Sequence, residues 1–508
     1  MIIMSKSAHV SQEASSGAAA YASAAMTPEQ KRILAVLVMG TLMSAVDVTI
    51  VLLAIASITS SLHTNLVMSI WIIIAYLLVV AIFTTQLGRL GDMYGRGQIF
   101  NLGFLIFTVG SFLCGASTSI YMLIAFRVLQ GVGGSMIQAN SGAIIADTFD
   151  RNNRGKAYGY TSMGWSTGSM LGIVLGGILT TFVGWQYIFY INIPIGAVAL
   201  WLGLKYIKDD ARLKEPIDFK GMLVLSAMLL LLTFSATEIV SAGESTRGIA
   251  MFAVGVILIP VFVWVERHEK YPIIDFGAFK NKILAHSLGA AFLQSAGYLA
   301  IVFMLIMYLQ GVRGLNPLDA SVLLIPGYII GGITGPRMGR LSDRIGARTV
   351  ATIGIALTLL TILIYYAFLN ATTPYWIIIA ATVVAGVGTS MFFPANSSAV
   401  MANAPSNNYG VASGLLRSLS NIGTLVSYLV TITVASLAVS REQAFKIFLG
   451  TSDLIGNIST EFLKSMHAVF IISAVILIAA AALSWTRGGE QRKEWTHSKE
   501  HVKPHGQG

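Results

Sequence analysis

The chain alternates between long apolar blocks and short polar segments along most of its length. A helix that crosses the hydrocarbon core of a bilayer needs about 20 apolar residues, and these blocks reach that length. The pattern therefore predicts an all-α polytopic membrane protein. We count fourteen predicted spans, with limits near 33–59, 68–88, 98–117, 119–142, 158–182, 185–206, 219–240, 247–266, 284–310, 318–337, 348–369, 374–400, 409–436 and 465–486.

The composition agrees with a membrane protein and excludes several other classes. Of the 508 residues, 55% are hydrophobic and 11% are charged, whereas soluble domains contain about 25% charged residues. The single cysteine, Cys114, excludes an intrachain disulfide and a multi-cysteine metal site. Residues 1–30 contain no continuous apolar core, so they predict a disordered cytoplasmic tail rather than a cleaved signal peptide.

The basic residues favour one side of the membrane. If both termini are cytoplasmic, the cytoplasmic segments contain 26 Lys and Arg residues, and the opposite segments contain 5. This asymmetry predicts a multi-pass protein of the plasma (inner) membrane with both ends in the cytoplasm. Because the excess of basic residues lies in short interhelical loops, we expect the lipid bilayer, and not nucleic acid, as the partner of this net charge of +10.

A repeated loop divides the chain into two related halves. Residues 88–95 read GRLGDMYG and residues 339–346 read GRLSDRIG, which match at five of eight positions. Parallel repeats of this kind place a substrate path between the halves, near the middle of the membrane. The predicted organisation is a six-helix half (31–206), an inserted helix pair (207–270), a second six-helix half (271–487) and a cytoplasmic tail (488–508).

Asp47 is a lone carboxylate in the middle of the first span. A charge at this depth costs at least about 2.5–3.5 kcal/mol on insertion scales. Arg127 lies about 12 Å into the fourth span, and Asp47 lies about 9 Å from the same edge of the membrane. The depths are similar, so the two side chains are expected to meet. We expect the pair to couple transport to protonation of Asp47, while the alternative is a static ion pair that only joins helices.

Five stretches resemble signatures of the major facilitator superfamily, in its fourteen-helix branch of drug:proton antiporters. The resemblance covers residues 31–487. It implies the major facilitator fold and export of amphipathic or cationic drugs in exchange for protons, by alternating access. The five stretches are 47–51, 88–96, 127–134, 164–177 and 184–196.

The resemblance also assigns roles to several residues. The repeated loops are expected to latch the halves together, and the alternative is that they only set membrane orientation; the latch residues are Gly88, Arg89, Asp92, Gly95, Arg96 and Asp343. Four glycines at every fourth position form a groove that acts as a hinge or seal, or else allows ordinary close packing; they are Gly164, Gly168, Gly172 and Gly176. Candidates to contact substrate are Asp47, Asn140, Trp165, Gln294, Tyr298, Asn396 and Asn421.

The expected activity is secondary transport without a cofactor. No phosphate-binding Gly-Lys-Ser/Thr loop occurs, so the proton gradient is the expected source of energy. We expect no catalytic residues and no metal site, because the eight histidines are scattered, and we expect a monomer that handles a small molecule and protons. Export of an endogenous metabolite, lipid or siderophore by the same mechanism is a related alternative. Gly168-Ser169 replaces the Gly-Pro that is usual in the branch, so a uniport or uptake carrier also stays open.

Overall fold

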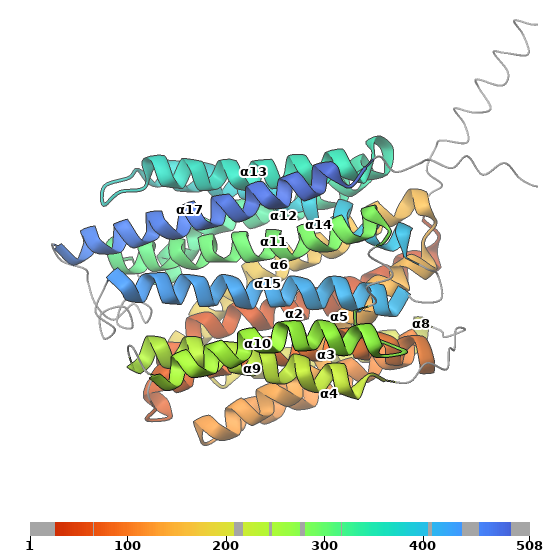
Figure 1. The fold of residues 1–508 in the computed structure, drawn as a ribbon, viewed down its shortest axis with the longest axis horizontal. Helices are drawn as coiled ribbons and strands as arrows, with labels where there is room; N and C mark the ends of the chain where they lie inside the picture. The colour runs from red at the N-terminus through yellow and green to blue at the C-terminus, as the bar shows by residue number, and fades with distance from the viewer. Residues whose placement is uncertain are drawn as a thin grey trace, which may run out of the picture.

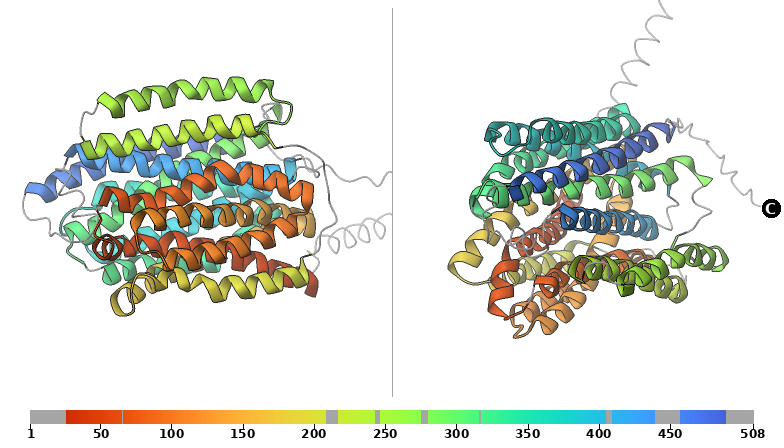
Figure 2. Two further views of the ribbon diagram at one scale, coloured as in Figure 1. Left: turned by 90° about the horizontal axis from the view of Figure 1, so that it is seen from below. Right: turned by 60° about the vertical axis from the view of Figure 1, so that its left-hand side comes forward.

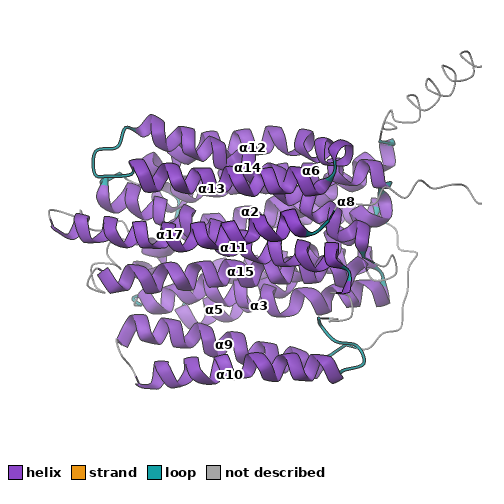
Figure 3. Ribbon diagram, turned by 45° about the horizontal axis from the view of Figure 1, so that its top comes forward, coloured by secondary structure: helices purple, strands orange, loops and turns teal. Residues whose placement is uncertain are grey.

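The computed structural model describes residues 26–64, 66–207, 217–242, 246–274, 280–315, 317–404, 409–438 and 457–488. Within these ranges the chain is helical and contains no strand (Figure 3). This confirms the all-α class that the apolar pattern predicts. A helix satisfies its own backbone hydrogen bonds, which a segment surrounded by lipid requires.

The described residues form a succession of helices. In chain order they are α2 (Pro28–Ser61), α3 (Leu66–Tyr94), α4 (Arg96–Gly115), α5 (Ile120–Thr148), α6 (Arg151–Phe182), α7 (Tyr187–Tyr190), α8 (Asn192–Tyr206), α9 (Phe219–Ala242), α10 (Thr246–His268), α11 (Lys282–Met307), the π-helical turn η2 (Tyr308–Val312), α12 (Pro317–Ile345), α13 (Ala347–Phe368), α14 (Tyr375–Asn403), α15 (Tyr409–Ala438) and α17 (Asn457–Thr486).

Twelve helices in the described ranges are long and apolar enough to cross a membrane. Helix α9 adds a shorter apolar stretch, Phe219–Ser235. Helix α15 is not among the twelve, although it is 30 residues long. The polytopic membrane fold is therefore confirmed, and the count of fourteen spans stays a prediction.

The halves meet through two pairs of helices. Helix α6 packs along α12, and α3 packs along α15. Helices α9 and α10 pack on each other at the edge of the bundle, where α9 also touches α3 and α15 (Figures 1 and 2). This peripheral place fits a helix pair inserted between two complete halves.

Both copies of the repeated loop end in a glycine with a positive φ. Gly95 has φ 114° and precedes α4, while Gly346 has φ 97° and precedes α13. Residues with a Cβ rarely adopt this conformation. The glycine that closes each copy therefore allows the sharp turn from one helix into the next.

Helix α2 begins earlier than predicted. The predicted disordered tail extends to residue 30, but α2 starts at Pro28. Thr27 accepts a hydrogen bond from the Gln30 amide, and the Gln30 side chain accepts one from the Thr27 amide, which forms a capping box. Proline suits the first position of a helix, so these three residues start α2. Residues 1–25 and 489–508 lie outside the described residues.

Candidate functional site

Asp47 and Arg127 form a buried ion pair inside the first half. The Arg127 Nη1 atom donates to Asp47 Oδ2 at 2.6 Å, and the two side chains are 0% and 1% exposed. Asp47 comes from α2 and Arg127 from α5, so the pair joins two helices through residues that are 80 positions apart in sequence. The structure thus brings together the two charged residues for which the sequence predicts similar depths in the membrane.

Two amides complete the shell of the Asp47 carboxylate. Gln130 Nε2 donates to Asp47 Oδ1 at 2.9 Å, and Asn192 Nδ2 donates to the same oxygen at 3.3 Å. Gln130 also accepts from Arg127 Nη1 and donates to Ser111 Oγ. Sequence analysis missed Gln130 and Asn192 as site residues. The available signal is that each lies in a signature stretch, and that Gln130 follows Arg127 by nearly one helical turn.

Arg127 is held on its remaining sides. Its Nε donates to the Ile72 carbonyl oxygen at 3.0 Å, and its guanidinium lies 4.4 Å from the centre of the Tyr76 ring. Removing one member of such a pair leaves a buried charge without compensation, which costs about 3–5 kcal/mol. The network is therefore stable only while both charges, or neither, are present.

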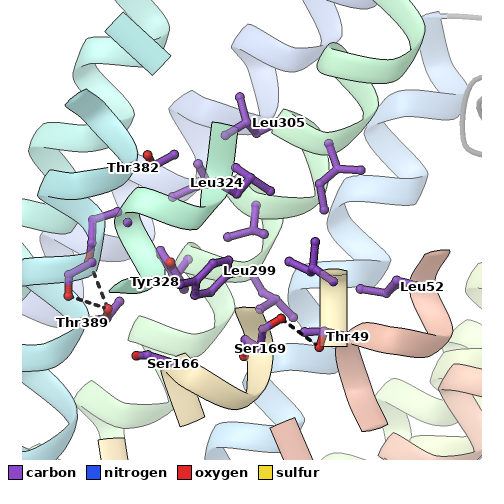
Figure 4. A pocket seen from close by; sticks show the side chains of 18 of the residues that line it. Thr49, Leu52, Ser166, Ser169, Leu299, Leu305, Leu324, Tyr328, Thr382 and Thr389 are labelled. Atoms are coloured by element: carbon purple, nitrogen blue, oxygen red, sulfur yellow. Dashed lines mark hydrogen bonds between the residues drawn. The ribbon is translucent and has the colours of Figure 1, made fainter. Parts of the chain in front are cut away.

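A cavity of about 210 Å³ lies between the two halves. Figure 4 shows its hydroxyl groups, with Thr49 and Ser169 on one side and Thr389 on the other. Its wall also includes the aromatic side chains of Trp165, Tyr298, Tyr328, Tyr365, Phe393 and Tyr428. None of the described residues that line it carries a charge. The cavity combines apolar surface with neutral hydroxyl groups, as expected of a site for an amphipathic molecule.

Trp165 and Tyr298 are the two proposed substrate contacts that line this cavity. Asp47 lies behind the wall, because Val48 and Thr49 face the cavity in its place. The other four are also absent from the wall, and each is engaged in helix packing: Asn140 with the Leu87 carbonyl, Gln294 with Thr358, Asn396 with the Ser287 carbonyl, and Asn421 with Gln138. These five residues do not line this cavity, and their contact with substrate stays a prediction.

The first repeated loop binds the opposite half. Asp92 Oδ1 accepts from the Gly410 amide at 3.0 Å, and Asp92 Oδ2 accepts from the Val411 amide at 3.1 Å. These amides belong to the first turn of α15, where free N–H groups and the helix dipole attract a carboxylate. Arg96 holds Asp92 at 2.6 Å and also pairs with Asp147.

The second repeated loop makes the reciprocal contact. Asp343 accepts from the Gly155 amide at 3.0 Å and from the Lys156 amide at 3.1 Å, in the second turn of α6. Each half therefore binds backbone amides near the start of a helix of the other half through an equivalent aspartate. We call the end of the bundle that carries both loops, 88–96 and 339–346, the latch end.

Arg89 links the latch end to the segment after the inserted helix pair. Its two terminal nitrogens donate to the carbonyl oxygens of Tyr271 and Pro272, both at 2.6 Å. Arg89 is thus held by backbone of the chain that connects α10 to the second half.

The glycine groove of α6 faces α2 in the same half. A Cβ added at Gly164, Gly168, Gly172 or Gly176 would meet residues of α2, from Val38 to Ile50. Other glycines make the close contact between halves: Gly155 and Gly159 on α6 lie against Gly335 and Gly339 on α12. The groove therefore joins α6 to the helix that carries Asp47, and the seal between halves at the latch end lies two turns away.

Comparison with known families gives this arrangement its context. The family model described as Major Facilitator Superfamily matches residues 37–428 and 338–505. The chain belongs to the major facilitator superfamily.

Relatives within the superfamily include exporters and a vitamin transporter. The chain is 28% identical to the riboflavin transporter RibZ of Clostridioides difficile, over 88% of this chain and 97% of that protein. It is 34% identical to multidrug resistance protein 3 of Bacillus subtilis, over 60% and 59% of the two chains. It is 26% identical to the multidrug efflux pump LfrA of Mycolicibacterium smegmatis, over 89% and 94%.

A solved structure supports the fold. The crystal structure of the human organic anion transporter MFSD10 (TETRAN) matches with a TM-score of 0.58 and 16% identity, over 89% of this chain and all of that chain. At this identity the likeness supports the major facilitator fold alone. The protein is therefore an integral membrane transporter of the superfamily, whose members act on small molecules.

Proposed function

We propose that this protein exports amphipathic compounds in exchange for protons by alternating access. The observation that supports this most directly is the Asp47–Arg127 pair, which lies one residue along α2 from the cavity wall. A buried carboxylate stays ionised beside a guanidinium and takes up a proton when that guanidinium withdraws. A movement of α2 relative to α5 would therefore couple the state of the cavity to protonation of Asp47.

Besides the Asp47–Arg127 pair, the latch end is the second part of the structure that would change during transport. In this structure both aspartates bind the opposite half, so the latch end is closed. From the distribution of basic residues we infer that the latch end faces the cytoplasm. The closed latch would then correspond to a transporter that can load or release on the outer side, and opening of the latch would give access from the cytoplasm.

The cavity favours amphipathic substrates without requiring a cation. Asp47, the acidic residue among the expected substrate contacts, does not line the cavity. The neutral hydroxyl and aromatic wall, together with the relative named as a riboflavin transporter, favours transport of an aromatic metabolite as the second candidate. That candidate includes uptake as well as export.

The remaining parts of the proposal follow from the sequence. We propose that the proton gradient drives transport without a cofactor, that the protein is no enzyme, and that it works as a monomer in the plasma (inner) membrane. A monomer is consistent with the Asp47 network, because every residue of that network comes from the first half of one chain.

Reconstituted vesicles test the proposal. The purified full chain is placed in vesicles with an acidic interior or an acidic exterior, and accumulation of ethidium, fluorescein and riboflavin is measured together with proton movement. Exchange with protons predicts accumulation only when the interior is acidic. Accumulation only with an acidic exterior would instead show uptake with protons, and accumulation that ignores the gradient would contradict proton coupling.

A further inference from the structure

A second deep arginine, Arg417 on α15, has no role in the network described above. Ser413 and Asn421, four residues on either side of it, both face α5 of the opposite half: Ser413 contacts Gly142, and Asn421 donates to Gln138 Oε1 at 3.3 Å. Residues four apart share one face of a helix. Arg417 therefore points into the interface between the halves and not toward lipid.

Arg417 differs from Arg127 in its surroundings. The ion pairs among the described residues do not include Arg417. The ionisable neighbour that acts on it is the Tyr158 phenol of α6, whose hydroxyl donates to the Gly142 carbonyl oxygen at 2.9 Å. The Arg417 side chain is half-buried, so it keeps open surface although its helix face is turned inward. A cation in this position is ready to bind an anion.

Arg417 lies on the path between the cavity and the latch end. Tyr428 lines the cavity and follows Arg417 by eleven residues on the same helix, which is about three turns and 16 Å, so both point to the same side. Ser162 also lines the cavity and lies about one turn after Tyr158. Arg417 and Tyr158 therefore both lie between the uncharged cavity and the latch end.

We propose that Arg417 binds the acidic group of the substrate, so that this transporter selects amphipathic organic anions. This inference rests on the proposed export function and narrows its substrate class. A guanidinium holds a carboxylate, sulfonate or phosphate through two parallel hydrogen bonds, while the aromatic body of the substrate packs in the cavity. No carboxylate among the described lining residues attracts a cation instead.

Equilibrium binding of two dyes of similar shape and opposite charge tests this directly. Fluorescein is anionic and rhodamine 123 is cationic, and both carry the same xanthene ring system. Binding to the purified full chain in neutral detergent is measured by fluorescence anisotropy, with 1-naphthoate as a smaller anion that competes. The wild-type protein is expected to bind fluorescein about tenfold or more tightly than rhodamine 123.

Two variants assign the preference to Arg417. Loss of a hydrogen-bonded charge predicts that Arg417→Gln weakens fluorescein binding by about ten- to a hundredfold and leaves rhodamine 123 within about twofold. Arg417→Lys keeps the charge and retains most of the preference. Thermal unfolding shows whether each variant is folded. The preference of the wild-type protein for fluorescein over rhodamine 123 is measured without either variant.

The outcomes separate this inference from the proposed coupling. Equal or tighter binding of rhodamine 123 to the wild type, a uniform loss of both dyes in Arg417→Gln, or no binding of either anion overturns the assignment of Arg417. Because binding needs no gradient, an anion preference without proton-driven transport would support Arg417 and contradict the proposed function alone.

Discussion

Replacing Asp47 by asparagine keeps the shape of the side chain and removes its charge. In the structure both carboxylate oxygens act as acceptors, one for Arg127 and the other for Gln130 and Asn192. An asparagine offers one acceptor oxygen and one donor nitrogen. Whichever way the amide turns, its NH₂ group faces another donor, and Arg127 loses its counter-charge.

The magnitude follows from these contacts. A buried charge that loses its partner destabilises a protein by about 3–5 kcal/mol, so Asp47→Asn is expected to lower the thermal stability of the detergent-solubilised protein clearly. Removing both charges in Asp47→Asn/Arg127→Gln leaves polar groups that can bond to each other. The double variant is therefore expected to recover most of the lost stability, as a double-mutant cycle would show.

Transport assays distinguish a structural role of Asp47 from a role in proton coupling. Uphill accumulation of fluorescein or ethidium in vesicles with an acidic interior is expected to be lost in Asp47→Asn and in the double variant. Exchange of labelled for unlabelled compound without a gradient is expected to survive in the double variant, because exchange needs the conformational change and not the proton. The wild type and the double variant are expected to have similar stability, so a difference in their transport reports the loss of the charged pair.

One result refutes this reasoning. If the double variant is stable and still concentrates either compound with the wild-type dependence on the pH gradient, then Asp47 only joins helices. The alternative of a static ion pair, left open by the sequence, would then be correct for this protein.

Other parts of the structure give shorter predictions. Asp92→Asn loses one of the two charged hydrogen bonds to α15, which at about 1.5–3 kcal/mol shifts the balance toward an open latch and slows dye transport, while dye binding stays within about twofold; a wild-type transport rate would contradict the latch. Gly88→Ala places a Cβ against a carbonyl of α15 and is expected to impair transport, whereas the control Gly177→Ala meets only one side-chain atom, at 3.6 Å, and keeps it; equal activity would show that the close contact is dispensable. Reporter fusions after residues 243 and 370 are expected to report the outer side, and a cytoplasmic signal at either place would show that the span count is wrong.

The sequence predicts the fold well because its signal is simple. Apolar length alone indicates membrane helices, and the repeated loop reveals the two halves. The meeting of Asp47 and Arg127 is also accessible, since depth in a membrane follows from position along a helix at 1.5 Å per residue. These predictions need no knowledge of how one helix is rotated against the next.

The residues that line the cavity are harder to predict, because they depend on how each helix is rotated about its axis. Asn140 and Asn396 are amides inside predicted spans, but they bond to carbonyl groups of neighbouring helices, and Asn140 lies beside Gly91 of the first repeated loop. A buried amide satisfies such a carbonyl as readily as it binds a substrate, so residue type and depth do not distinguish the two uses. Gln130 and Asn192 were missed for the same reason, because only the packed structure shows that both point at Asp47.

Helix α6 connects the parts that the proposed mechanism requires. Its glycine groove packs closely on α2, the helix of Asp47. The same helix lines the cavity from Ser162 to Ile173, and near its start the amides of Gly155 and Lys156 bind Asp343 of the other half. The glycines bring the backbones of α6 and α2 close together, so the two helices are expected to move as one body. Opening of the latch is therefore expected to pull on α6 and to shift α2 against α5, the helix that carries Arg127. This sequence of contacts explains how an event at the latch end can separate Asp47 from Arg127 although no residue of either loop touches the pair.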